Sequence, residues 1–345
     1  MVQAVPMIHL LAALAAFAIS FALTPLIRWY GRRAGVVDVP NERSSHQVPT
    51  PRGGGIAILA GILVTATAFG VLEERAALVI AAGAIVVAIA GLIDDIRSLG
   101  ALPRFLTHCA AAILLMAFGL QLDRIDGPWG GGISLALLAA PVTLVFIVGL
   151  TNAYNFMDGI NGIASLEAVV AATALAVLFL GTGDQSGAIL AIAVAFAAAG
   201  FLPWNFLSGS IFMGDVGSGA LGFLLAALVL RHTAGGGSFV AAVLPLLPFL
   251  LDTGVTLVRR IVRRERFYAA HRSHFYQRLN ALGWTHTAVT LVWATLAAAG
   301  AVISVTYARL SPAERTAALA GLVLVHVAIG VAITLRELSA SRRLR

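Results

Sequence analysis

Long apolar runs separated by short polar loops follow one another along the whole chain. A helix of about 20 apolar residues crosses the roughly 30 Å hydrocarbon core of a bilayer. We expect eleven such spans, at residues 5–27, 54–72, 76–93, 102–120, 133–150, 163–180, 188–204, 217–232, 239–258, 286–307 and 314–335. The pattern predicts an all-α, polytopic integral membrane protein, because the strands of membrane β-barrels alternate in polarity instead.

The arginines are distributed unevenly between the two sets of loops that these spans define. One set comprises loops 28–53, 94–101, 151–162, 205–216 and 259–285 and the tail 336–345. With the residues at its edges, this set carries 18 arginines, against five on the other side. Because loops rich in Arg and Lys stay in the cytoplasm, we expect this side to be cytoplasmic.

The composition narrows the class of protein further. Apolar residues make up 59% of the 345 residues and charged residues only 11%, well below the roughly 25% of a soluble protein. All 23 basic residues are arginines in or beside the loops, which favours contact with membrane lipid over binding of nucleic acid. The lack of lysine excludes a P-loop, and the lone Cys109 excludes a disulfide framework. We expect a single domain over residues 1–345.

Four short polar segments interrupt the apolar sequence, and all four fall on the predicted cytoplasmic side. They are Ile93–Asp95, Asn152–Asn161, Phe212–Ser218 and His271–His274. Ionisable and polar groups beside membrane spans are costly and mark functional sites. If these segments converge, they can build one metal-assisted active site at the cytoplasmic face.

Asp94 and Asp95 end a long apolar run. Carboxylates at the C-terminus of a helix face the negative end of the helix dipole, at a cost of about 0.3–1 kcal/mol each. Capping therefore does not explain the pair, whereas a bound cation or a proton-transfer role does. A metal ion, or Arg97 and Arg104, would keep both acids ionised.

The second segment places a polar side chain at every third position: Asn152, Asn155, Asp158 and Asn161. This step keeps side chains on one side of a helical turn and predicts a polar ladder, although a loop rich in turn formers is the alternative. Asp215 in the third segment is equally a helix N-cap or part of a phosphate site at a helix N-terminus.

His271 and His274 lie three residues apart in an arginine-rich loop. Neutral imidazoles bind metal, whereas imidazolium or the flanking Arg272 binds phosphate. Arg43 and His46 precede a run of three glycines in loop 28–53 and indicate a second anion-binding segment.

The order of these motifs resembles that of the polyprenyl-phosphate N-acetylhexosamine-1-phosphate transferases, the family of the WecA, MraY and TagO types and of the eukaryotic dolichol-phosphate enzyme. The motifs are Asp-Asp, Asn-x-x-Asn-x-x-Asp-Gly, Phe-Met-Gly-Asp-x-Gly-Ser, the histidine-containing loop, Pro40-x-x-Arg43-x-x-His46 and Trp204-Asn205. The resemblance extends over most of the chain. It implies a multi-pass protein of the bacterial cytoplasmic (inner) membrane whose substrates are a UDP-sugar and undecaprenyl or another polyprenyl phosphate.

The resemblance also implies the chemistry and the residues that perform it. The lipid phosphate attacks the β-phosphate of the UDP-sugar and UMP leaves, with Mg²⁺ as cofactor and Mn²⁺ as a substitute. Asp94, Asp95 and Asp158 would be the catalytic acids, and Asp215 with Asp95 would bind the metal. The substrate-binding residues would be Asn152, Asn155 and Asn205 for the nucleotide-sugar, Phe212 for the uracil ring, and Arg43, His46, His271, Arg272 and His274 for phosphates and sugar.

Elementary phosphate chemistry agrees with this assignment. Transfer between phosphates depends on alignment and charge neutralisation, and Mg²⁺ is commonly held by one or two carboxylates plus substrate phosphate. The second pKa of a phosphate monoester is about 6, so the lipid nucleophile is already deprotonated at neutral pH. We therefore expect direct attack, with Asp94 positioning or deprotonating the lipid phosphate.

Some positions depart from the family pattern and leave alternatives open. The stretch His271-Arg-Ser-His274 is most similar to initiating transferases of O-antigen synthesis (the WbpL type), which use UDP-linked 6-deoxy-N-acetylhexosamines. A cell-wall-type transferase of the same family is the alternative. An ion-coupled transporter that uses Asp252 and Glu167, acids inside predicted spans, is a hypothesis of another class. A homodimer is a further expectation left open.

Overall fold

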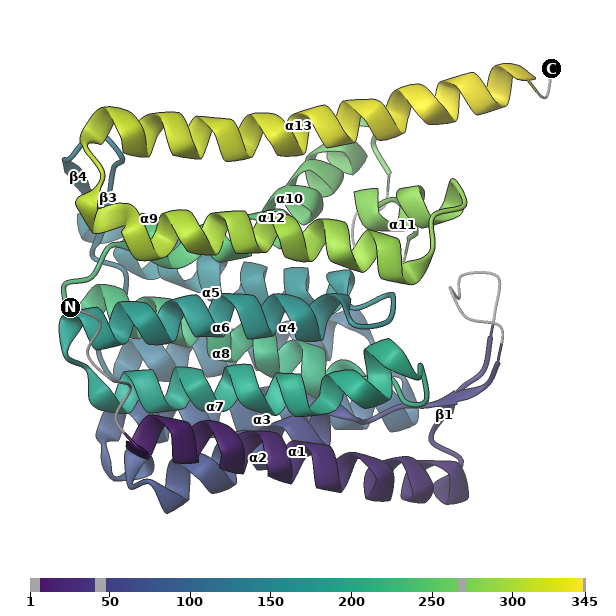
Figure 1. The fold of residues 1–345 in the computed structure, drawn as a ribbon, viewed down its shortest axis with the longest axis horizontal. Coiled ribbons are helices and arrows are strands. Elements are labelled where there is room, and N and C mark those ends of the chain that lie inside the picture. The colour runs from purple at the N-terminus through teal and green to yellow at the C-terminus, as the bar shows by residue number, and fades with distance from the viewer. Residues whose placement is uncertain (1–6, 41–47, 266–270, 344–345) are drawn as a thin grey trace.

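The computed structural model describes residues 7–40, 48–265 and 271–343, and its long helices run side by side along one common direction (Figure 1). Within the described residues, nine helical segments are long and apolar enough to cross a membrane. The elements that make up these segments are α1 (Met7–Ala34), α3 (Arg75–Arg97), η2 with α5 (Ala136–Leu138 and Ala139–Met157), α6 (Ile163–Thr182), α7 with η3 (Gln185–Leu202 and Pro203–Leu207), α8 (Asp215–Ala234), α9 to α10 (Phe239–Val262), α12 with η5 (His286–Thr306 and Tyr307–Arg309) and α13 (Pro312–Arg343). The prediction of an all-α, multi-pass membrane protein is confirmed.

Two of the eleven predicted spans are shorter than the sequence suggested. Helix α2 (Gly55–Ala68) has 14 residues and α4 (Ala101–Ala117) has 17. At 1.5 Å per residue they are about 21 and 26 Å long, less than the hydrocarbon core. The apolar residues that extended these predicted spans lie in turns at Gly70, with φ of 70°, before the 3₁₀ helix η1 (Val71–Glu73), and at Gly119, with φ of 84°.

The predicted span 239–258 is built from three pieces. These are α9 (Phe239–Val243), the 3₁₀ turn η4 (Leu244–Leu246) and α10 (Leu247–Val262). Pro245 and Pro248 supply no backbone N–H to a continuous helix. Helix α10 then runs obliquely toward α13 (Figure 1), and a cavity lies between α10, α12 and α13.

Short strands and one short helix lie outside the bundle. Strand β1 (Val37–Asp38) pairs antiparallel with β2 (Thr50–Pro51), and β3 (Arg124–Asp126) pairs antiparallel with β4 (Gly132–Ser134). The two hairpins lie at opposite ends of the helices, and α11 (Phe275–Ala281) lies at the β1 end (Figure 1).

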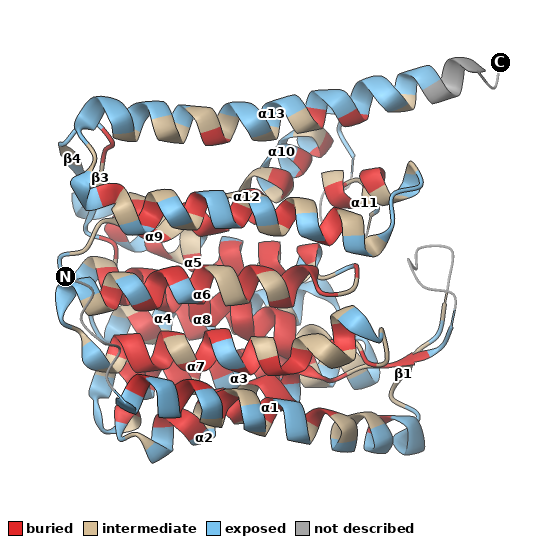
Figure 2. Cartoon of the chain, in the orientation of Figure 1, coloured by how far each residue is buried: buried red, intermediate tan, exposed pale blue. Residues whose placement is uncertain are grey.

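Helix α8 occupies the centre of the bundle. It packs against α2, α3, α5, α6 and α7, and 94% of its most apolar 18-residue stretch is buried. The helix is therefore enclosed on all sides, as expected for a helix without a polar face. Buried residues gather around it, whereas α1 and α13 expose much of their outer surface (Figure 2). The N-terminus of α8 is thereby held in the middle of one end of the molecule.

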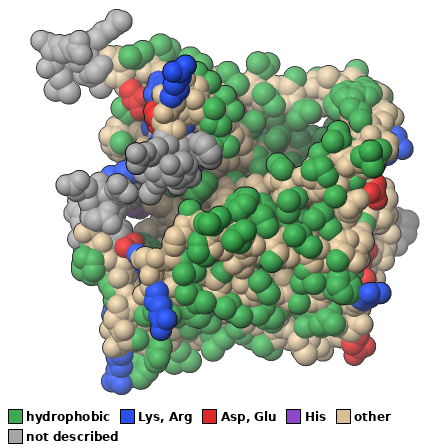
Figure 3. Space-filling model, turned by 180° about the vertical axis from the view of Figure 1, so that it is seen from behind, with side chains coloured by type: hydrophobic (Ala, Val, Ile, Leu, Met, Phe, Trp, Pro, Cys, Tyr) green, Lys and Arg blue, Asp and Glu red, His purple; other side chains and the backbone are tan. Residues whose placement is uncertain are grey.

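The outer surface has the character of a membrane protein. On the face seen from behind, hydrophobic side chains cover the middle and charged side chains lie toward the two ends (Figure 3). Such an apolar belt can be solvated by lipid tails, since every helical backbone group is already satisfied within its helix.

Close packing around the α8 N-terminus depends on glycine. A Cβ at Gly91 of α3 would collide with the backbone of Asp215, and a Cβ at Gly55 of α2 would collide with the backbone of Gly217. The backbones of α2 and α3 can therefore contact the backbone at the start of α8 directly. This close packing brings residues at the helix ends and in the adjoining loops together there.

We predict that Gly91→Ala lowers the free energy of unfolding by about 1–3 kcal/mol, the usual cost of overpacking, because the rigid backbone at Asp215 must move. Thermal unfolding of the purified protein followed by tryptophan fluorescence measures the effect. Gly149→Ala in α5 is the matched control, since a Cβ there meets no atom of the described chain within 4 Å. Equal melting temperatures for the two variants would contradict this packing argument.

Candidate active site

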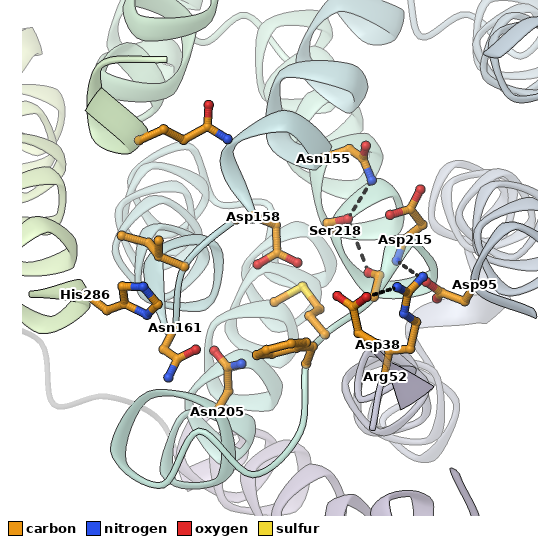
Figure 4. Close-up of a pocket in the computed structure, with 16 residues that line it drawn as sticks. Asp38, Arg52, Asp95, Asn155, Asp158, Asn161, Asn205, Asp215, Ser218 and His286 are labelled. Atoms are coloured by element: carbon orange, nitrogen blue, oxygen red, sulfur yellow. Dashed lines mark hydrogen bonds and ion pairs between the residues drawn. The ribbon is translucent and has the colours of Figure 1, made fainter. Parts of the chain in front are cut away.

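A cavity of about 340 Å³ opens at the end of the bundle where α8 begins (Figure 4). Its walls come from the β1–β2 hairpin, the end of α3, the segment after α5, the loop before α8, and α11 and α12. The lining residues include Asp38, Arg52, Asp95, Asn155, Asp158, Asn161, Asn205, Phe212, Asp215, Ser218, Gln277 and His286. Three of the four predicted polar segments therefore meet in one pocket.

The pocket is polarised along its length. Asp95, Asp215 and the Asp38–Arg52 pair lie toward one end, and Asn161, Asn205 and His286 lie toward the other, with Asp158 between them (Figure 4). A strongly charged end suits phosphate groups and a cation, whereas amides and an imidazole suit neutral polar groups such as a sugar or a base.

Asp95 joins α3 to α8. Its Oδ1 accepts a hydrogen bond from the backbone N–H of Asp215 at 3.0 Å, and its Oδ2 accepts one from Val216 at 3.2 Å. Asp215 is thus the first residue of α8 rather than its N-cap, and the carboxylate that caps the helix comes from 120 residues earlier. Gly214, with φ of 76°, occupies the N-cap position and leaves room for this carboxylate.

Arg104 of α4 connects two of the predicted acids. Its Nη1 lies 2.9 Å from Asp94 Oδ2 and 2.6 Å from Asp215 Oδ2. These distances are those of charge-assisted hydrogen bonds, so the arginine offsets the repulsion between two close carboxylates. At the pocket mouth, Arg52 Nη2 lies 2.5 Å from Asp38 Oδ1.

The predicted asparagine ladder lies along two neighbouring cavities. Asn152 donates to Val148 O at 2.7 Å, lies 3.2 Å from a ring nitrogen of His108, and lines a small side cavity with Arg104 and Asp215. Asn155 donates to Ser218 Oγ of α8 at 3.0 Å and faces the main pocket. Asn155 also lines the side cavity, so the three-residue step brings both amides to the space around Asp215, and of the two only Asn155 reaches the main pocket as well.

Asp158 follows the last residue of α5 and points into the pocket (Figure 4). Burial raises the pKa of its carboxyl well above the usual range, and the negative charges of Asp215 and Asp95 raise it further. A cation or substrate that brings positive charge or hydrogen-bond donors would favour its ionised form.

Asn205 and Phe212 are positioned by backbone contacts. Asn205 is 4% exposed; its Oδ1 accepts from Gly162 N at 2.7 Å and its Nδ2 donates to Ile211 O at 3.0 Å. Phe212 N–H donates to Pro51 O at 2.8 Å, while its carbonyl accepts from Gly54 N at 3.0 Å. Asn205 thus fixes the loops around the pocket, and Phe212 ties the β1–β2 hairpin to the start of α8.

The histidine segment lies beside the pocket and does not line it in the described structure. His274 is 3% exposed, and its ring and that of His271 lie 6.0 and 6.4 Å from the ring of Phe156. Arg272 is exposed. Burial, followed by the nearby His274, Arg260 and Arg259, lowers the pKa of His271 to about 4. The candidates Arg43 and His46 fall outside the described residues.

Asp252, an acid within a membrane span, has a structural partner. Its Oδ1 accepts from Phe275 N at 2.8 Å and its Oδ2 from Tyr276 N at 3.1 Å, so it caps α11 from α10. Helix α11 in turn donates from Tyr276 Oη to Phe156 O at 2.9 Å, beside the pocket. Both oxygens of the Asp252 carboxylate, which suggested ion transport from the sequence, therefore accept hydrogen bonds that hold α11 in place.

Sequence reasoning did not select several residues of the pocket. Asp38, Gln277 and His286 carry no motif, and only the fold brings them to this end of the bundle. Arg52 and Ser218 lie within segments that the sequence indicated, the anion-binding segment before the glycine run and the Phe-Met-Gly-Asp-x-Gly-Ser motif, although neither was expected to have a role of its own.

The pocket has the donor chemistry for a hard divalent cation. Among the described residues, no cluster of three or more His, Cys, Asp or Glu side chains is arranged to hold a metal on its own. The carboxylates of Asp95, Asp158 and Asp215 nevertheless share the pocket, and Mg²⁺ is usually bound through one or two carboxylates together with substrate phosphates. These residues fit a cation shared between protein and substrate.

Fold and site together describe a membrane-embedded enzyme with an acidic, arginine-flanked pocket at the end of its spans. The family model of "Glycosyl transferase family 4" matches residues 77–233. The chain is 32% identical to the "Probable undecaprenyl-phosphate N-acetylglucosaminyl 1-phosphate transferase" of Bacillus subtilis (strain 168), over 78% of this chain and 76% of the relative. It is 33% identical to the "Decaprenyl-phosphate N-acetylglucosaminephosphotransferase" of Mycobacterium tuberculosis (strain ATCC 25618 / H37Rv), over 91% and 86%. The chain belongs to the polyprenyl-phosphate N-acetylhexosamine-1-phosphate transferase family.

We predict that Asp252→Ala loosens α11, because two backbone N–H groups lose their acceptor. Loss of a helix cap costs about 0.5–2 kcal/mol. Limited trypsin digestion measures the change, since Arg278 of α11 is only 8% exposed in the intact protein. Cleavage after Arg278 is expected to accelerate, while cleavage after the exposed Arg124 at the opposite end stays constant. Unchanged cleavage at Arg278 would refute the capping role.

We also predict a pH dependence of stability that originates at His271. Its folded-state pKa of about 4 lies below the unfolded value of about 6.5, so the unfolded chain binds more protons between these values. The free energy of unfolding therefore falls as the pH drops from 6.5 toward 4. The slope is below the limit of about 1.4 kcal/mol per pH unit, because the ring is only half-buried and solvent screens it. In the His271→Gln variant, the melting temperature should depend less steeply on pH between 4 and 6.5 than in the wild type. An equal slope in the two proteins would contradict the assignment of this pH dependence to His271.

Proposed function

We propose that this protein transfers an N-acetylhexosamine 1-phosphate from a UDP-sugar to a polyprenyl phosphate, releasing UMP. The observation that carries the proposal is the convergence of Asp95, Asp158 and Asp215 in one pocket at the end of the membrane spans. The names of the relatives support it, since they describe transfer of N-acetylglucosaminyl phosphate to undecaprenyl or decaprenyl phosphate. N-acetylglucosamine is therefore the first donor sugar to test, ahead of its 6-deoxy analogues.

The polarity of the pocket supports an orientation for the donor. The diphosphate would lie toward Asp95, Asp215 and Arg52, and the amide end would receive the remainder of the UDP-sugar. Asn155 and Asn205 would contact or position the nucleotide-sugar, and Phe212 offers a ring face for the uracil. Asn152 sits on the side cavity next to Arg104 and would act near the reacting phosphates.

The loops around the pocket would complete the substrate contacts. We assign Arg43, His46, His271, Arg272 and His274 to the sugar diphosphate or the lipid phosphate. Since His271 and His274 lie beside the ring of Phe156 and do not line the pocket, this role requires that their loop move toward the pocket when substrate binds.

Mg²⁺, with Mn²⁺ as a substitute, would neutralise the negative charge of the diphosphate when bound. Asp215 and Asp95 are the proposed ligands. The unused lone pairs of Asp95 remain compatible with this role, because each oxygen accepts one backbone hydrogen bond. Arg104 holds the Asp94 and Asp215 carboxylates beside one another.

The proposed reaction is a direct displacement. An oxygen of the polyprenyl phosphate forms a bond to the β-phosphorus of the UDP-sugar, the bond from that phosphorus to the bridging oxygen breaks, and UMP leaves with the electron pair. The second pKa of a phosphate monoester is about 6, so the nucleophile needs orientation more than deprotonation. Asp94 and Asp158 would supply that orientation and any residual proton transfer.

We place the enzyme in the bacterial inner membrane with the pocket facing the cytoplasm. The loops at the pocket end hold 18 of the 23 arginines, and such loops remain on the cytoplasmic side. UDP-sugars would then reach the pocket from the cytoplasm and the lipid from the bilayer.

We predict that Asp215→Asn lowers transfer by more than about 100-fold, the scale on which loss of one electrostatic contact to a reacting centre acts. The measurement is incorporation of labelled sugar from UDP-N-acetylglucosamine into polyprenyl phosphate by purified protein with Mg²⁺. Asp123→Asn, an exposed aspartate at the opposite end, is the control and should retain full activity. Near-normal transfer by a correctly folded Asp215→Asn protein would overturn the assignment of this carboxylate.

A further inference from the structure

A second cavity, of about 360 Å³, lies between α10, α12 and α13, with α11 at one end. Its size falls in the range of small-molecule sites. Leu251, Val255 and Leu296 line it together with Val327 and Val331 of α13. Val327 and Val331 are 53% and 52% exposed, and the molecule is hollowed beneath α13 (Figure 3). The groove therefore opens sideways, toward the lipid that surrounds a membrane span.

Two arginines stand at one end of this groove. Arg259 and Arg278 flank the ring of Phe275, with their guanidinium carbons 5.9 and 5.2 Å from its centre. Arg278 donates from Nε and Nη2 to Glu337 at 2.9 and 2.6 Å. This end is also the end of the catalytic pocket, since Gln277 of α11 lines that pocket.

Two hydrogen-bond donors at the groove are buried without an acceptor. Arg278 Nη1 and Trp293 Nε1 have no hydrogen-bond partner within the described residues, and both side chains line the groove. The two residues are 8% and 3% exposed. A buried donor left unsatisfied costs about 1–3 kcal/mol. The site therefore fits a ligand with acceptor oxygens at its polar end and an apolar chain.

We propose that this groove binds an anionic glycerophospholipid of the surrounding bilayer as a resident, non-reacting ligand. Its phosphate would accept from Arg278 Nη1 beside the positive charge of Arg259, an ester carbonyl would accept from Trp293 Nε1, and an acyl chain would lie along α13. Basic pockets between membrane helices on the cytoplasmic side are suited to anionic headgroups, and the arginine distribution assigns this end to the cytoplasm.

The position of α11 separates this lipid from the reaction. The groove and the catalytic pocket share no lining residue in the described chain, because α11 stands between them with Gln277 on one side and Phe275 and Arg278 on the other. A phosphate held by Arg278 is thus on the wrong side of α11 to reach Asp95 or Asp215. The groove takes a lipid that stabilises the protein instead of the lipid that reacts.

Helix α11 also connects the lipid-binding groove to the catalytic pocket through hydrogen bonds. Arg278 ties α11 to Glu337 and Thr334 of α13, and Tyr276 ties α11 to Phe156 beside Asp158. A lipid bridging α11 and α13 stabilises this arrangement. Binding to the folded state alone raises the melting temperature, so phosphatidylglycerol should raise it and phosphatidylcholine should not.

The test measures retention of phosphatidylglycerol and phosphatidylcholine by the purified full-length protein, using native mass spectrometry without any UDP-sugar. Val331→Trp fills the groove, and Val325→Trp places the same ring on α13 outside it, at a residue of similar exposure, 47%. Trp293→Phe keeps one aromatic ring and removes the N–H donor together with the five-membered part of the indole. We expect Val331→Trp to lose phosphatidylglycerol, Trp293→Phe to bind it roughly fivefold more weakly, as loss of one hydrogen bond predicts, and Val325→Trp to match the wild type.

Three results would overturn the proposal. These are equal retention by Val331→Trp and Val325→Trp, equal retention of phosphatidylcholine and phosphatidylglycerol by the wild type, and displacement of phosphatidylglycerol by an equimolar amount of polyprenyl phosphate. The last result would mean that the groove holds the acceptor lipid. Because no donor sugar is present, these outcomes are independent of whether the transferase assignment holds.

Discussion

The contact between the Asp95 carboxylate and the first backbone N–H groups of α8 is the interaction on which the site depends. A carboxylate at the C-terminus of its own helix is disfavoured by that helix's dipole, and the first N–H groups of a helix lack partners within it. The contact resolves both problems, because Asp95 of α3 accepts from Asp215 and Val216. It also fixes the Asp215 side chain near Asp94, where Arg104 contacts both carboxylates. Arg104 thereby offsets part of the repulsion between the Asp94 and Asp215 carboxylates.

The same kind of contact recurs on the other side of the pocket. Asp252 of α10 caps α11, and α11 closes the pocket through Gln277. Asp95 joins helices that are 120 residues apart in the chain, whereas Asp252 joins the consecutive elements α10 and α11. Each carboxylate lies against a helix N-terminus, where the helix dipole stabilises its charge. The position of Asp252 within a membrane span is therefore explained by its capping of α11. The pocket is held from two directions, by α3 on α8 and by α10 on α11.

Charged and apolar side chains are distributed over different surfaces of this molecule. The face seen in Figure 3 is apolar across its middle. The pocket is polar and acidic with arginines at its edge, and the groove beside α13 is apolar with arginines at one end. A water-soluble nucleotide-sugar and a lipid phosphate can meet only where the first two surfaces join. This junction lies at the ends of the spans, at the first turn of α8, and helix α11 is shared between the pocket and the groove.

The sequence alone determined the fold class and most of the chemistry. Apolar runs of spanning length can only be satisfied as helices in lipid, and polar groups such as Asp94, Asp95, Asp158 and Asp215 are retained beside spans only for a reason. What the tertiary structure alone decided is which side chains share a space. Asp38 and His286 line the pocket, whereas His274 does not, and Asn205 both lines the pocket and holds the loops around it. Helix lengths were also settled there, since apolar residues after α2 and α4 enter turns at Gly70 and Gly119. The physical reason is that hydrophobicity and local spacing are properties of neighbouring residues, whereas a cap such as Asp95 on α8 joins positions 120 residues apart through packing that no local pattern encodes.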